Sequence, residues 1–565
     1  PNCMGLVDPV NKRYFSFMNP WAVSGLMPGP VSLIVQSGML SAAFLLDIMS
    51  NGLTGISKAC SIGNKVDVDE CDLLEVLLGD DCTQSIALYL ESFSDGRRFA
   101  DLCRRSPKPI VVLKGGKSRK GAEAAMSHTA SLAGNHRIAR QVLAQAGVVE
   151  AEDFKEMIDL ARTLAMVAPR NGARVAILTF SGGAGIVSAD AFEGKPLTVA
   201  ELSESTKDIL KSYFPPWMPV SNPVDLWPAM EVHGRSKMYS ASVKAALQDP
   251  GVDAILMHAA AWDKSAMDLK EIAEAAKGAG KPVFIWYIGQ RDTIAHYQAE
   301  ALELKIPAFL ELSRAIECMA SAFGKEALPM QESGSSESAG TVLEPDLRRL
   351  IETGDGPLDE YQSKRVLAAC GIPVVDEQIV QAVQDLEPAA SRMGYPVVLK
   401  GLLPGEVHKT ERGLVRLNVA NRAEAAQAHR EMTLKMGGKG VVLLQKQVSG
   451  RVELICGLLR DSQFGPCVML GVGGIMAEVI DDAVFAMAPL SRGEALGLIG
   501  RLRSQRLLDG FRGGPPVNRA ELAGILVALG ELGLSQPRVR EVDINPLILA
   551  AEGLVSVDAN IVLGS

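Results

Sequence analysis

The chain has 565 residues, which is enough for three or four domains of about 150 residues each. Its formal net charge of −9 argues against a general nucleic-acid-binding surface, and the lack of a run of about 18 apolar residues argues against a membrane span. We expect no secretory signal, and the nine scattered cysteines form no CxxC pair, so we expect a cytoplasmic protein with reduced thiols.

Short apolar runs recur through the first half of the chain. In chain order, they lead into polar or Gly-rich turns and then into helical patterns. Continuous apolar strands that alternate with helices predict parallel, doubly wound α/β sheets. In such sheets, binding sites form at the carboxyl ends of the strands. The runs comprise residues 31–35, 86–90, 110–113, 175–178, 254–257 and 283–286.

Two of these runs lead into Ser/Gly turns that open helices rich in small residues. Ser37 and Gly38 follow the run at 31–35, and Gly182 and Gly183 follow the run at 175–178. Glycine allows a tight turn, and the free N–H groups of a helix start attract an anion. Many turns of this kind bind nothing. As a pair, they predict two helix starts that hold one phosphoryl group from two sides.

His128 is one of only seven histidines and lies in a run of small and hydroxylated residues, 126–134. Such neighbours leave an imidazole accessible, and a neutral imidazole is a good nucleophile toward phosphorus near neutral pH. The alternative is a polar loop or a helix start, with Ser127 or Thr129 as the cap. The two predicted phosphate-binding turns favour the nucleophile, so we predict that His128 becomes phosphorylated.

The composition changes at about residues 328–345, where Gln331–Ser338 is typical of a flexible linker. Beyond the linker, Lys400 ends an apolar strand and could neutralise phosphate, although most lysines at strand ends are simply solvated. Glu453 is a carboxylate in an otherwise buried-looking strand, which packing alone explains poorly. A second boundary is expected near residue 170, where a turn precedes a new strand.

Oxygen-bearing side chains gather near the end of the sequence. Asp543 and Asn545 are two residues apart on one predicted strand, so they face the same side. Asp558 ends the next apolar run. Hard oxygen ligands on paired strands suit Mg²⁺ bound with nucleotide phosphates. The alternative is hairpin chemistry, in which the Asn-Pro pair simply ends a strand.

In this order, the motifs resemble those of the NDP-forming acyl-CoA synthetases, also called ADP-forming acetyl-CoA synthetases, which are relatives of succinyl-CoA synthetase. The resemblance covers nearly the whole chain. Residues 127–129 resemble the family's phosphohistidine motif, although Ala130 replaces the usual glycine. The other matching segments are 1–6, 360–365, 371–374, 408–410, 463–466, 489–491, 508–513 and 543–546.

The resemblance implies two doubly wound, flavodoxin-like domains of the succinyl-CoA synthetase type, followed by an ATP-grasp domain. The implied parts are residues 1–22 as the end of a CoA-binding domain that is mostly missing here, 23–170 as the ligase domain with the phosphohistidine, 171–328 as a second ligase-type domain, 329–348 as a linker and 349–565 as the ATP-grasp domain.

The resemblance also implies residue roles. His128 would be the phosphorylated nucleophile, Glu91 would orient it, and the two Ser/Gly turns would hold the phosphohistidine. The remaining implied roles are nucleotide contacts by Lys400, Glu453 and Gln445, Mg²⁺ binding by Asp543, Asn545 and Asp558, and a second phosphohistidine at His408.

The implied reaction converts a carboxylic acid, ATP and CoA to acyl-CoA, ADP and phosphate, through an acyl phosphate and phosphorylated His128. We expect a homo-oligomer, a dimer, without nucleic-acid or membrane partners. One alternative is an ATP-dependent, CoA-ligating lyase of the dimethylsulfoniopropionate type. Another is a non-catalytic, regulatory module that binds CoA and nucleotide.

One loop bears on the identity of the substrate acid. Residues 222–226 resemble a family loop that lies near the acyl site. Asp225 and the following Trp227 are therefore predicted to line the acyl pocket, and Trp262 follows another strand of the same domain. An aromatic wall would favour a flat or cationic acid over acetate, through stacking or cation–π contact. The alternative role of both tryptophans is packing.

Overall fold

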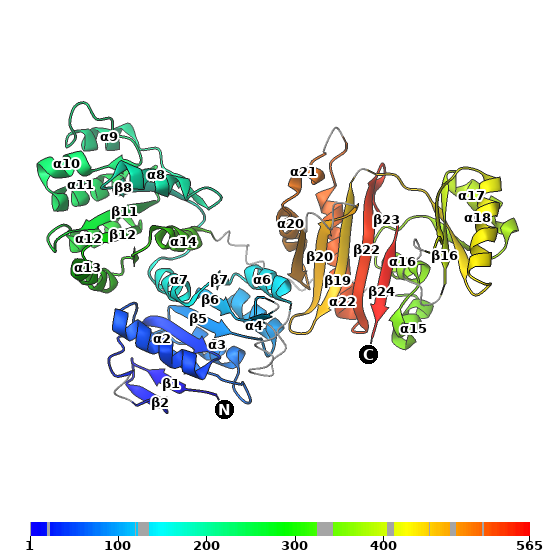
Figure 1. Cartoon of the computed structure of the whole chain (residues 1–565), viewed down its shortest axis with the longest axis horizontal. Helices are drawn as coiled ribbons and strands as arrows, with labels where there is room; N and C mark the ends of the chain where they lie inside the picture. The colour runs from blue at the N-terminus through cyan, green and yellow to red at the C-terminus, as the bar shows by residue number, and fades with distance from the viewer. Residues whose placement is uncertain are drawn as a thin grey trace. The chain divides into compact units, whose positions relative to one another are not determined.

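The computed structural model of the chain divides into two compact units, each of which is described by itself (Figure 1). Unit 1 comprises residues 1–133 and 146–332, and unit 2 comprises residues 134–145 and 333–565. His128 and His408 lie outside the described residues. The structure describes residues 2–19, 23–118, 120–121, 135–324, 343–403, 412–450, 452–474, 482–510 and 514–564.

The first sheet of unit 1 has the strand order β2-β1-β4-β3-β5-β6-β7. From β4 to β7 the neighbouring strands run parallel, whereas β1 and β2 form an antiparallel hairpin at one edge. The bounds are β1 (Gly5–Asp8), β2 (Arg13–Ser16), β3 (Pro28–Val35), β4 (Ile56–Ser61), β5 (Ser85–Leu90), β6 (Ile110–Lys114) and β7 (Val149–Ala151), with helices α2 (Gly38–Asn51), α3 (Glu70–Leu78), α4 (Gly96–Arg105) and α7 (Phe154–Met166).

The second sheet of unit 1 is parallel, with the order β10-β8-β11-β12-β13 and with β9 beside β8. Every residue of its central strand β11 is buried, as expected for a strand covered on both faces. The bounds are β8 (Ala173–Thr179), β9 (Leu197–Val199), β10 (Val224–Asp225), β11 (Ala254–Ala261), β12 (Val283–Gly289) and β13 (Ala308–Phe309), with α8 (Gly182–Asp190), α9 (Glu204–Lys211), α10 (Trp227–His233), α11 (Arg235–Gln248), α12 (Leu269–Ala279), α13 (Arg291–Glu303) and α14 (Leu312–Phe323).

Unit 2 contains two antiparallel sheets, with the orders β14-β24-β22-β19-β20-β21 and β15-β18-β16-β17; β23 pairs with β22. The strand bounds are β14 (Gly356–Pro357), β15 (Glu377–Val380), β16 (Val397–Leu402), β17 (Val415–Val419), β18 (Val441–Lys446), β19 (Glu453–Asp461), β20 (Gly465–Val472), β21 (Ala483–Met487), β22 (Val539–Ala550), β23 (Gly553–Ser556) and β24 (Ala559–Leu563).

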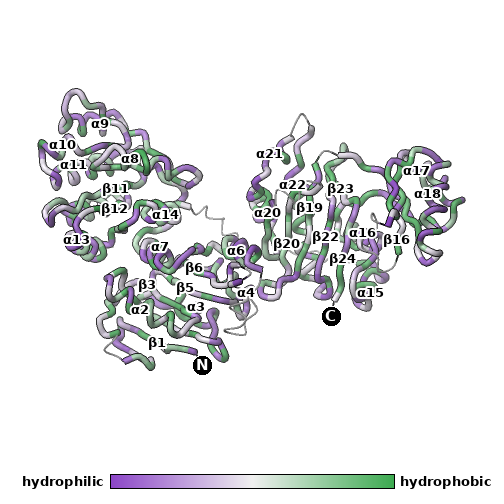
Figure 2. The backbone as a smooth tube through the Cα atoms, in the orientation of Figure 1, coloured by the Kyte–Doolittle hydropathy of each residue, from purple (hydrophilic) through white to green (hydrophobic). Residues whose placement is uncertain are grey.

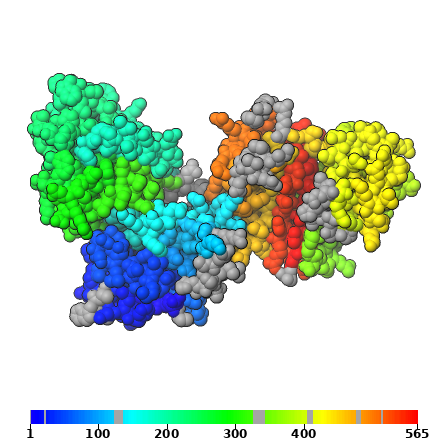
Figure 3. Space-filling model, viewed as in Figure 1, coloured from blue at the N-terminus to red at the C-terminus, as the bar shows by residue number. Residues whose placement is uncertain are grey.

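Helices complete the cores of unit 2. The smaller sheet and its helices α17 and α18 enclose a separate apolar core and form a rounded lobe, yellow in Figure 3. The larger sheet packs against α22, and its strand β20 is among the apolar stretches in Figure 2. The helix bounds are α6 (His136–Gln145), α15 (Pro345–Thr353), α16 (Glu360–Ala369), α17 (Leu386–Met393), α18 (Arg422–Lys435), α20 (Arg492–Gly500), α21 (Gln505–Leu508) and α22 (Arg519–Ser535).

The parallel, doubly wound sheets predicted from the apolar runs are confirmed. One local prediction was wrong. Lys400 lies inside β16 rather than at its end, since the strand continues to Leu402. Glu453 does lie in a largely buried strand, as the first residue of β19. All nine cysteines are free thiols. Within the described ranges, no helix is both long enough and apolar enough for a membrane span.

Candidate functional site

The carboxyl ends of β3, β5 and β6 bring together Gln36, Glu91 and Lys114. The Gln36 side-chain oxygen accepts a hydrogen bond from the Glu91 N–H, with 2.7 Å between the two atoms. Lys114 Nζ donates to the main-chain oxygens of Glu91 and Gly115, at 2.5 and 2.6 Å. Burial lowers the pKa of Lys114 to about 8. These bonds join the turns after three neighbouring strands and thereby fix the backbone around Glu91.

The Glu91 side chain is buried, with 7 % exposure. One of its carboxylate oxygens accepts a hydrogen bond from the Tyr89 hydroxyl at 3.4 Å. The other oxygen has no hydrogen-bond partner among the described residues. Burying a carboxylate oxygen without a partner is costly, so the arrangement favours a donor that comes from elsewhere. An imidazole N–H would be such a donor.

Helix α2 begins at Gly38, directly after the turn that holds Gln36. The Ser37 side chain makes no capping hydrogen bond to the first turn, so it leaves the N–H groups of that turn to another acceptor. Position 38 also has no room for a side chain, because a Cβ atom there would lie 2.6 Å from the main-chain oxygen of Asn2. Glycine is therefore required by the close approach of the N-terminal segment.

The second predicted helix start, in α8, has the same uncapped form. Ser181 precedes Gly182 with extended backbone, and its side chain makes no capping hydrogen bond. Asp225 lies beside this helix start, since a Cβ atom at Gly182 would be 3.3 Å from Asp225 Oδ2. The other Asp225 oxygen accepts a hydrogen bond from the Trp227 N–H at 3.1 Å. Asp225 thus lies near the positive end of α8.

His258 supports the same turn and was not singled out from the sequence. Its Nδ1 atom lies 2.9 Å from the Thr179 hydroxyl, and its Nε2 atom lies 3.0 Å from the Ser188 hydroxyl. The Thr179 hydroxyl donates its one proton to the main-chain oxygen of Ser181, so His258 Nδ1 must be the donor to Thr179. Burial lowers the pKa of His258 to about 4, which keeps the ring neutral. The sequence prediction ended this strand at Met257, before the histidine.

The two tryptophans near the predicted acyl site do come together. The rings of Trp227 and Trp262 meet edge to face, with 5.5 Å between their centroids. The Arg235 guanidinium lies 4.2 Å from the centroid of the Trp262 ring, and 39 % of Trp262 remains exposed. A cation therefore already covers part of this aromatic surface.

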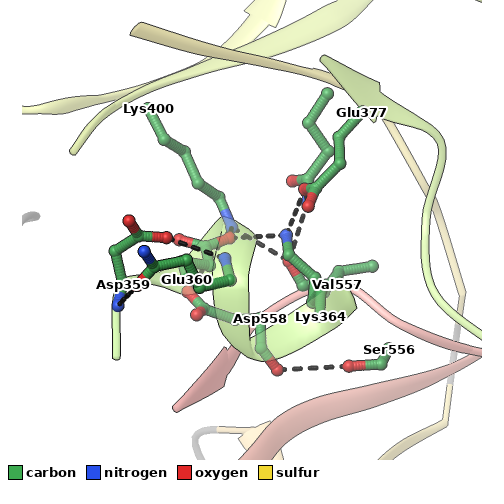
Figure 4. Close-up of polar contacts among 10 residues, drawn as sticks. Asp359, Glu360, Lys364, Glu377, Lys400, Ser556, Val557 and Asp558 are labelled. Carbon is green, nitrogen blue, oxygen red and sulfur yellow. Dashed lines mark hydrogen bonds and ion pairs between the residues drawn. The ribbon is translucent and has the colours of Figure 1, made fainter. Parts of the chain in front are cut away.

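Unit 2 holds a buried cluster of charged side chains where α16, β16 and the residues before β24 meet (Figure 4). Lys400 Nζ lies 2.6 Å from Glu360 Oε1 and 3.4 Å from Asp558 Oδ2, and it donates to the main-chain oxygen of Val557 at 2.9 Å. Burial acts to lower the pKa of Lys400, but the Asp558 and Glu360 carboxylates outweigh burial and raise this pKa. Lys400 is thus held as a buried cation.

Glu360 links Lys400 to a second buried lysine. Lys364 Nζ lies 2.7 Å from Glu360 Oε1 and also contacts Glu377 (Figure 4). Burial raises the pKa of Glu377 to about 7, against the opposing effect of Lys364. Gln445 Nε2 donates to Glu377 Oε2 at 3.2 Å. The cluster therefore includes two of the three predicted nucleotide contacts, Lys400 and Gln445.

Sequence reasoning gave no role to Glu360, Lys364 or Glu377, although a signal was present. Residues 360, 363, 364 and 367 are all buried positions of α16 and follow the spacing of an amphipathic stripe. Charged residues at two positions of a buried stripe indicate an internal ionic cluster, because isolated buried charges are strongly disfavoured.

The three predicted metal ligands lie near one another. Burial, and then the charges of Glu541 and Asp558, raise the pKa of Asp543 to about 6. Asn545 is exposed, and its N–H donates to the main-chain oxygen of Asp558 at 3.3 Å. Carboxylates that repel each other in this way accept a cation readily. Within the described part of the chain, no three His, Cys, Asp or Glu side chains form a metal-binding group.

Glu453, the third predicted nucleotide contact, lies at the start of β19 and is half-buried. Gly474 packs against it, since a Cβ atom at position 474 would lie 2.9 Å from Glu453 Oε2. Asp543 and Glu453 both belong to the larger sheet, on the paired strands β22 and β19.

Replacing Glu360 with glutamine is expected to lower the free energy of unfolding of unit 2 by about 3 kcal/mol, because two buried lysines lose a shared carboxylate. The matched variant Glu431→Gln, which breaks an exposed pair with Arg416, should cost about 0.5 kcal/mol or less. Urea unfolding followed by circular dichroism is the measurement, since all five tryptophans lie in unit 1. Equal losses in both variants would contradict the buried cluster.

Three family models match successive parts of the chain. Residues 28–164 match the succinyl-CoA ligase like flavodoxin domain, residues 175–309 match the Ligase-CoA domain, and residues 349–563 match the ATP-grasp domain. The matches follow the two α/β sheets of unit 1 and then the antiparallel sheets of unit 2, so the predicted fold class is confirmed.

The chain is similar to known enzymes over its whole length. It is 33 % identical to acetate–CoA ligase [ADP-forming] I of Archaeoglobus fulgidus, over 100 % of this chain and 82 % of that protein. It is 27 % identical to a trans-feruloyl-CoA synthase from an unknown prokaryotic organism, over 99 % and 80 % of the two chains. Among solved structures, the dinucleotide forming acetyl-coenzyme A synthetase 1 of Ca. Korarchaeum cryptofilum, in complex with phosphate and ADP, has a TM-score of 0.50 and 30 % identity, over 57 % of this chain and 69 % of that chain.

Proposed function

Because this chain belongs to the ADP-forming acetyl-CoA synthetase family, we propose that His128 carries a phosphoryl group between an acyl site in unit 1 and a nucleotide site in unit 2. The chain is an acid–thiol ligase that converts a carboxylic acid, ATP and CoA to acyl-CoA, ADP and phosphate. Its full-length relatives are ligases, so neither the lyase nor the regulatory module is favoured.

The observation that carries the proposal is the buried carboxylate oxygen of Glu91 without a partner in the described chain. An N–H of the His128 imidazole would satisfy this oxygen. That hydrogen bond would fix the tautomer of the ring and leave the opposite nitrogen free to attack phosphorus. The uncapped starts of α2 and α8 would hold the phosphoryl oxygens through main-chain N–H groups.

In this proposal, the phosphoryl group passes from ATP to His128 and then to the acid, before CoA takes the acyl group. A nitrogen of His128 attacks the terminal phosphorus of ATP, the bond from that phosphorus to the bridging oxygen breaks, and ADP leaves. A carboxylate oxygen of the acid then takes the phosphoryl group from His128, which yields an acyl phosphate. The CoA sulfur attacks the acyl carbon, the acyl–oxygen bond breaks, and phosphate leaves while the thiol proton passes to solvent. A covalent carrier is needed because two sites in separate units share no transition state.

On the nucleotide side, Lys400, Gln445 and Glu453 would contact the nucleotide. The buried ammonium group of Lys400 would offset phosphate charge, and Gln445 would orient the base or ribose by hydrogen bonding. The oxygen-donor set of Asp543, Asn545 and Asp558 fits Mg²⁺, because mutually repelling carboxylates beside an amide favour a hard cation. When bound, Mg²⁺ would supply charge stabilisation at the phosphates.

Other parts of the assignment stay predictions: the second phosphohistidine at His408, the homodimer, and the boundaries at 22, 170, 328 and 348. The parts they delimit are the end of a CoA-binding domain, two ligase-type domains, a linker and the ATP-grasp domain.

The reaction is tested by measuring ADP release with Mg-ATP across a panel of acids. ADP formation should require both CoA and an acid, and acyl-CoA and phosphate should appear in equal amounts. ADP release that ignores CoA, or AMP as the product, would contradict the proposed reaction.

For the substrate, we propose a flat aromatic acid that stacks beside Trp227. Asp225, next to the start of α8, would mark the edge of the same pocket. The names of two relatives state chemically different acyl groups, acetate in one and feruloyl in the other. Family membership therefore does not identify the acid that this chain uses. Arg235 already covers the Trp262 ring, and its charge would repel the cationic group of an onium acid, so the pair favours an uncharged aromatic group over an onium group.

Trp227→Ala is expected to lower kcat/KM for a hydroxycinnamate about fivefold and to leave acetate within about twofold, because a stacked ring contributes about 1 kcal/mol. The measurement compares kcat/KM for acetate, a hydroxycinnamate and an onium acid. Trp217→Ala is the matched control, since Trp217 is 75 % exposed in the same unit. Unchanged values for all three acids would show that Trp227 is only packing.

A further inference from the structure

Helix α6 follows the His128 motif in the sequence, yet it belongs to unit 2 rather than to unit 1. There it packs on β21, the edge strand of the larger sheet. β21 pairs with β20 on one side only, so alternate residues direct main-chain N–H and C=O groups away from the sheet. An edge of this kind must be covered or blocked.

Two glutamines of α6 satisfy the outward main-chain groups of β21. The Gln141 side-chain oxygen accepts a hydrogen bond from the Phe485 N–H, with 2.6 Å between the atoms. The Gln145 side chain makes two bonds to Met487: its oxygen accepts from the N–H at 2.8 Å, and its Nε2 donates to the main-chain oxygen at 3.2 Å. Gln145 is 5 % exposed, so its bonds are shielded from water.

Arg137 extends the pattern by one step. Its Nη2 donates to the main-chain oxygen of Ala483 at 2.9 Å, and its guanidinium lies 5.6 Å from the centroid of the Phe485 ring. Positions four apart on a helix rise about 6.0 Å, and positions two apart on a strand rise about 6.8 Å, so the two spacings match closely. The polar face of α6 therefore acts as a substitute neighbouring strand for β21.

We propose that Gln141 and Gln145 are positioning residues that fasten the chain just after the His128 motif to the nucleotide-binding unit. The inference rests on the proposed phosphohistidine at position 128. Asn135 directly precedes α6 and accepts a hydrogen bond from the Arg137 N–H at 3.0 Å, so the fixed part begins seven residues after His128. The fastening serves phosphoryl transfer from ATP, and the acyl-CoA side of the reaction does not depend on it.

The test separates the two routes by which His128 can be labelled in the full chain. One route uses ATP labelled in the terminal phosphate, and the other uses acyl-CoA with labelled inorganic phosphate. The double variant Gln141→Leu, Gln145→Leu should slow labelling from ATP tenfold or more and leave labelling from acyl-CoA and phosphate within twofold. Gln427→Leu is the matched control, because this glutamine is exposed on α18 of the same unit.

Two single Gln→Glu variants distinguish the positioning role from general packing. Gln141 only accepts in its contact with β21, so Gln141→Glu should stay within threefold of wild type by the ATP route. Gln145 must also donate, and its Nε2 lies 3.5 Å from Glu494 Oε1, so Gln145→Glu should lose tenfold or more. A role in general packing predicts no such difference between two Gln→Glu variants on one helix.

The outcomes separate this inference from the proposed function. If wild-type protein takes label by neither route, the phosphohistidine assignment fails. If wild type takes label by both routes and the double variant loses both equally, or loses neither, the positioning role is wrong while the proposed function stands. Loss by the ATP route alone, with Gln141→Glu tolerated, is the result that supports the inference.

Discussion

Replacing His128 with alanine is expected to abolish both phosphorylation by Mg-ATP and overall turnover, a loss of about 10⁴-fold or more. In the proposed scheme, no other group attacks the terminal phosphorus of ATP. The Glu91 carboxylate would lose its proposed hydrogen bond from the His128 imidazole. The hydrogen bonds of Gln36 and Lys114 to the Glu91 backbone would remain. The variant should therefore fold and still bind its substrates.

The measurement is incorporation of labelled phosphate into the protein. The label in wild type should be lost in acid and kept in base, as expected for a phosphohistidine. His296→Ala is a suitable control, since His296 is exposed on α13. Full labelling of His128→Ala at wild-type stoichiometry would remove His128 from the reaction.

Asp543→Asn is expected to reduce labelling from ATP about 100-fold or more and yet to stabilise the nucleotide-free protein. Burial, with repulsion from Glu541 and Asp558, raises the pKa of Asp543 to about 6. The native state therefore holds this proton more tightly than the unfolded chain does. As pH rises from about 4 to about 6, the free energy of unfolding falls because of this group, and the loss persists at higher pH. Asparagine removes that loss.

The stability effect is read from Tm without nucleotide or Mg²⁺. At about pH 7.5, Asp543→Asn should melt about 2 °C or more above wild type, and the difference should shrink toward about pH 4.5. Labelling from acyl-CoA and phosphate should remain within about twofold of wild type. Asp509→Asn, in an exposed pair with Arg519, should change neither property. A lower Tm for Asp543→Asn at neutral pH would contradict the assigned burial.

Much of unit 1 could be predicted because its strands are continuous apolar runs. The run at 86–90 became β5 nearly unchanged, and Glu91 followed it at the carboxyl end. The prediction failed where a polar residue is satisfied inside the core. β11 continues past Met257 through His258, because the Ser188 and Thr179 hydroxyls each form a hydrogen bond with one ring nitrogen of this histidine. Nothing in the sequence near His258 indicates these two partners.

Unit 2 was harder to predict because its site depends on contacts between distant segments. The role of Lys400 as a buried cation depends on Glu360, forty residues before it, and on Asp558 near the end of the chain. The sequence indicated Lys400 as a phosphate ligand but not the carboxylates that hold it. The packing of α6 on β21 could not be predicted either. Amphipathic spacing indicates that one face of a helix is buried, but it does not identify the strand that buries it.

The cover on β21 also has a consequence for synthesis of the protein. Gln141 and Phe485 are 344 residues apart, so the strand is made long after the helix that covers it. At about 5–20 residues per second, roughly 20–70 s separate the two on the ribosome. During that interval α6 has no strand to bind, and β21, once made, shows an open edge until α6 reaches it. A fragment that starts after the linker would keep this edge open permanently, and we expect it to self-associate through β21.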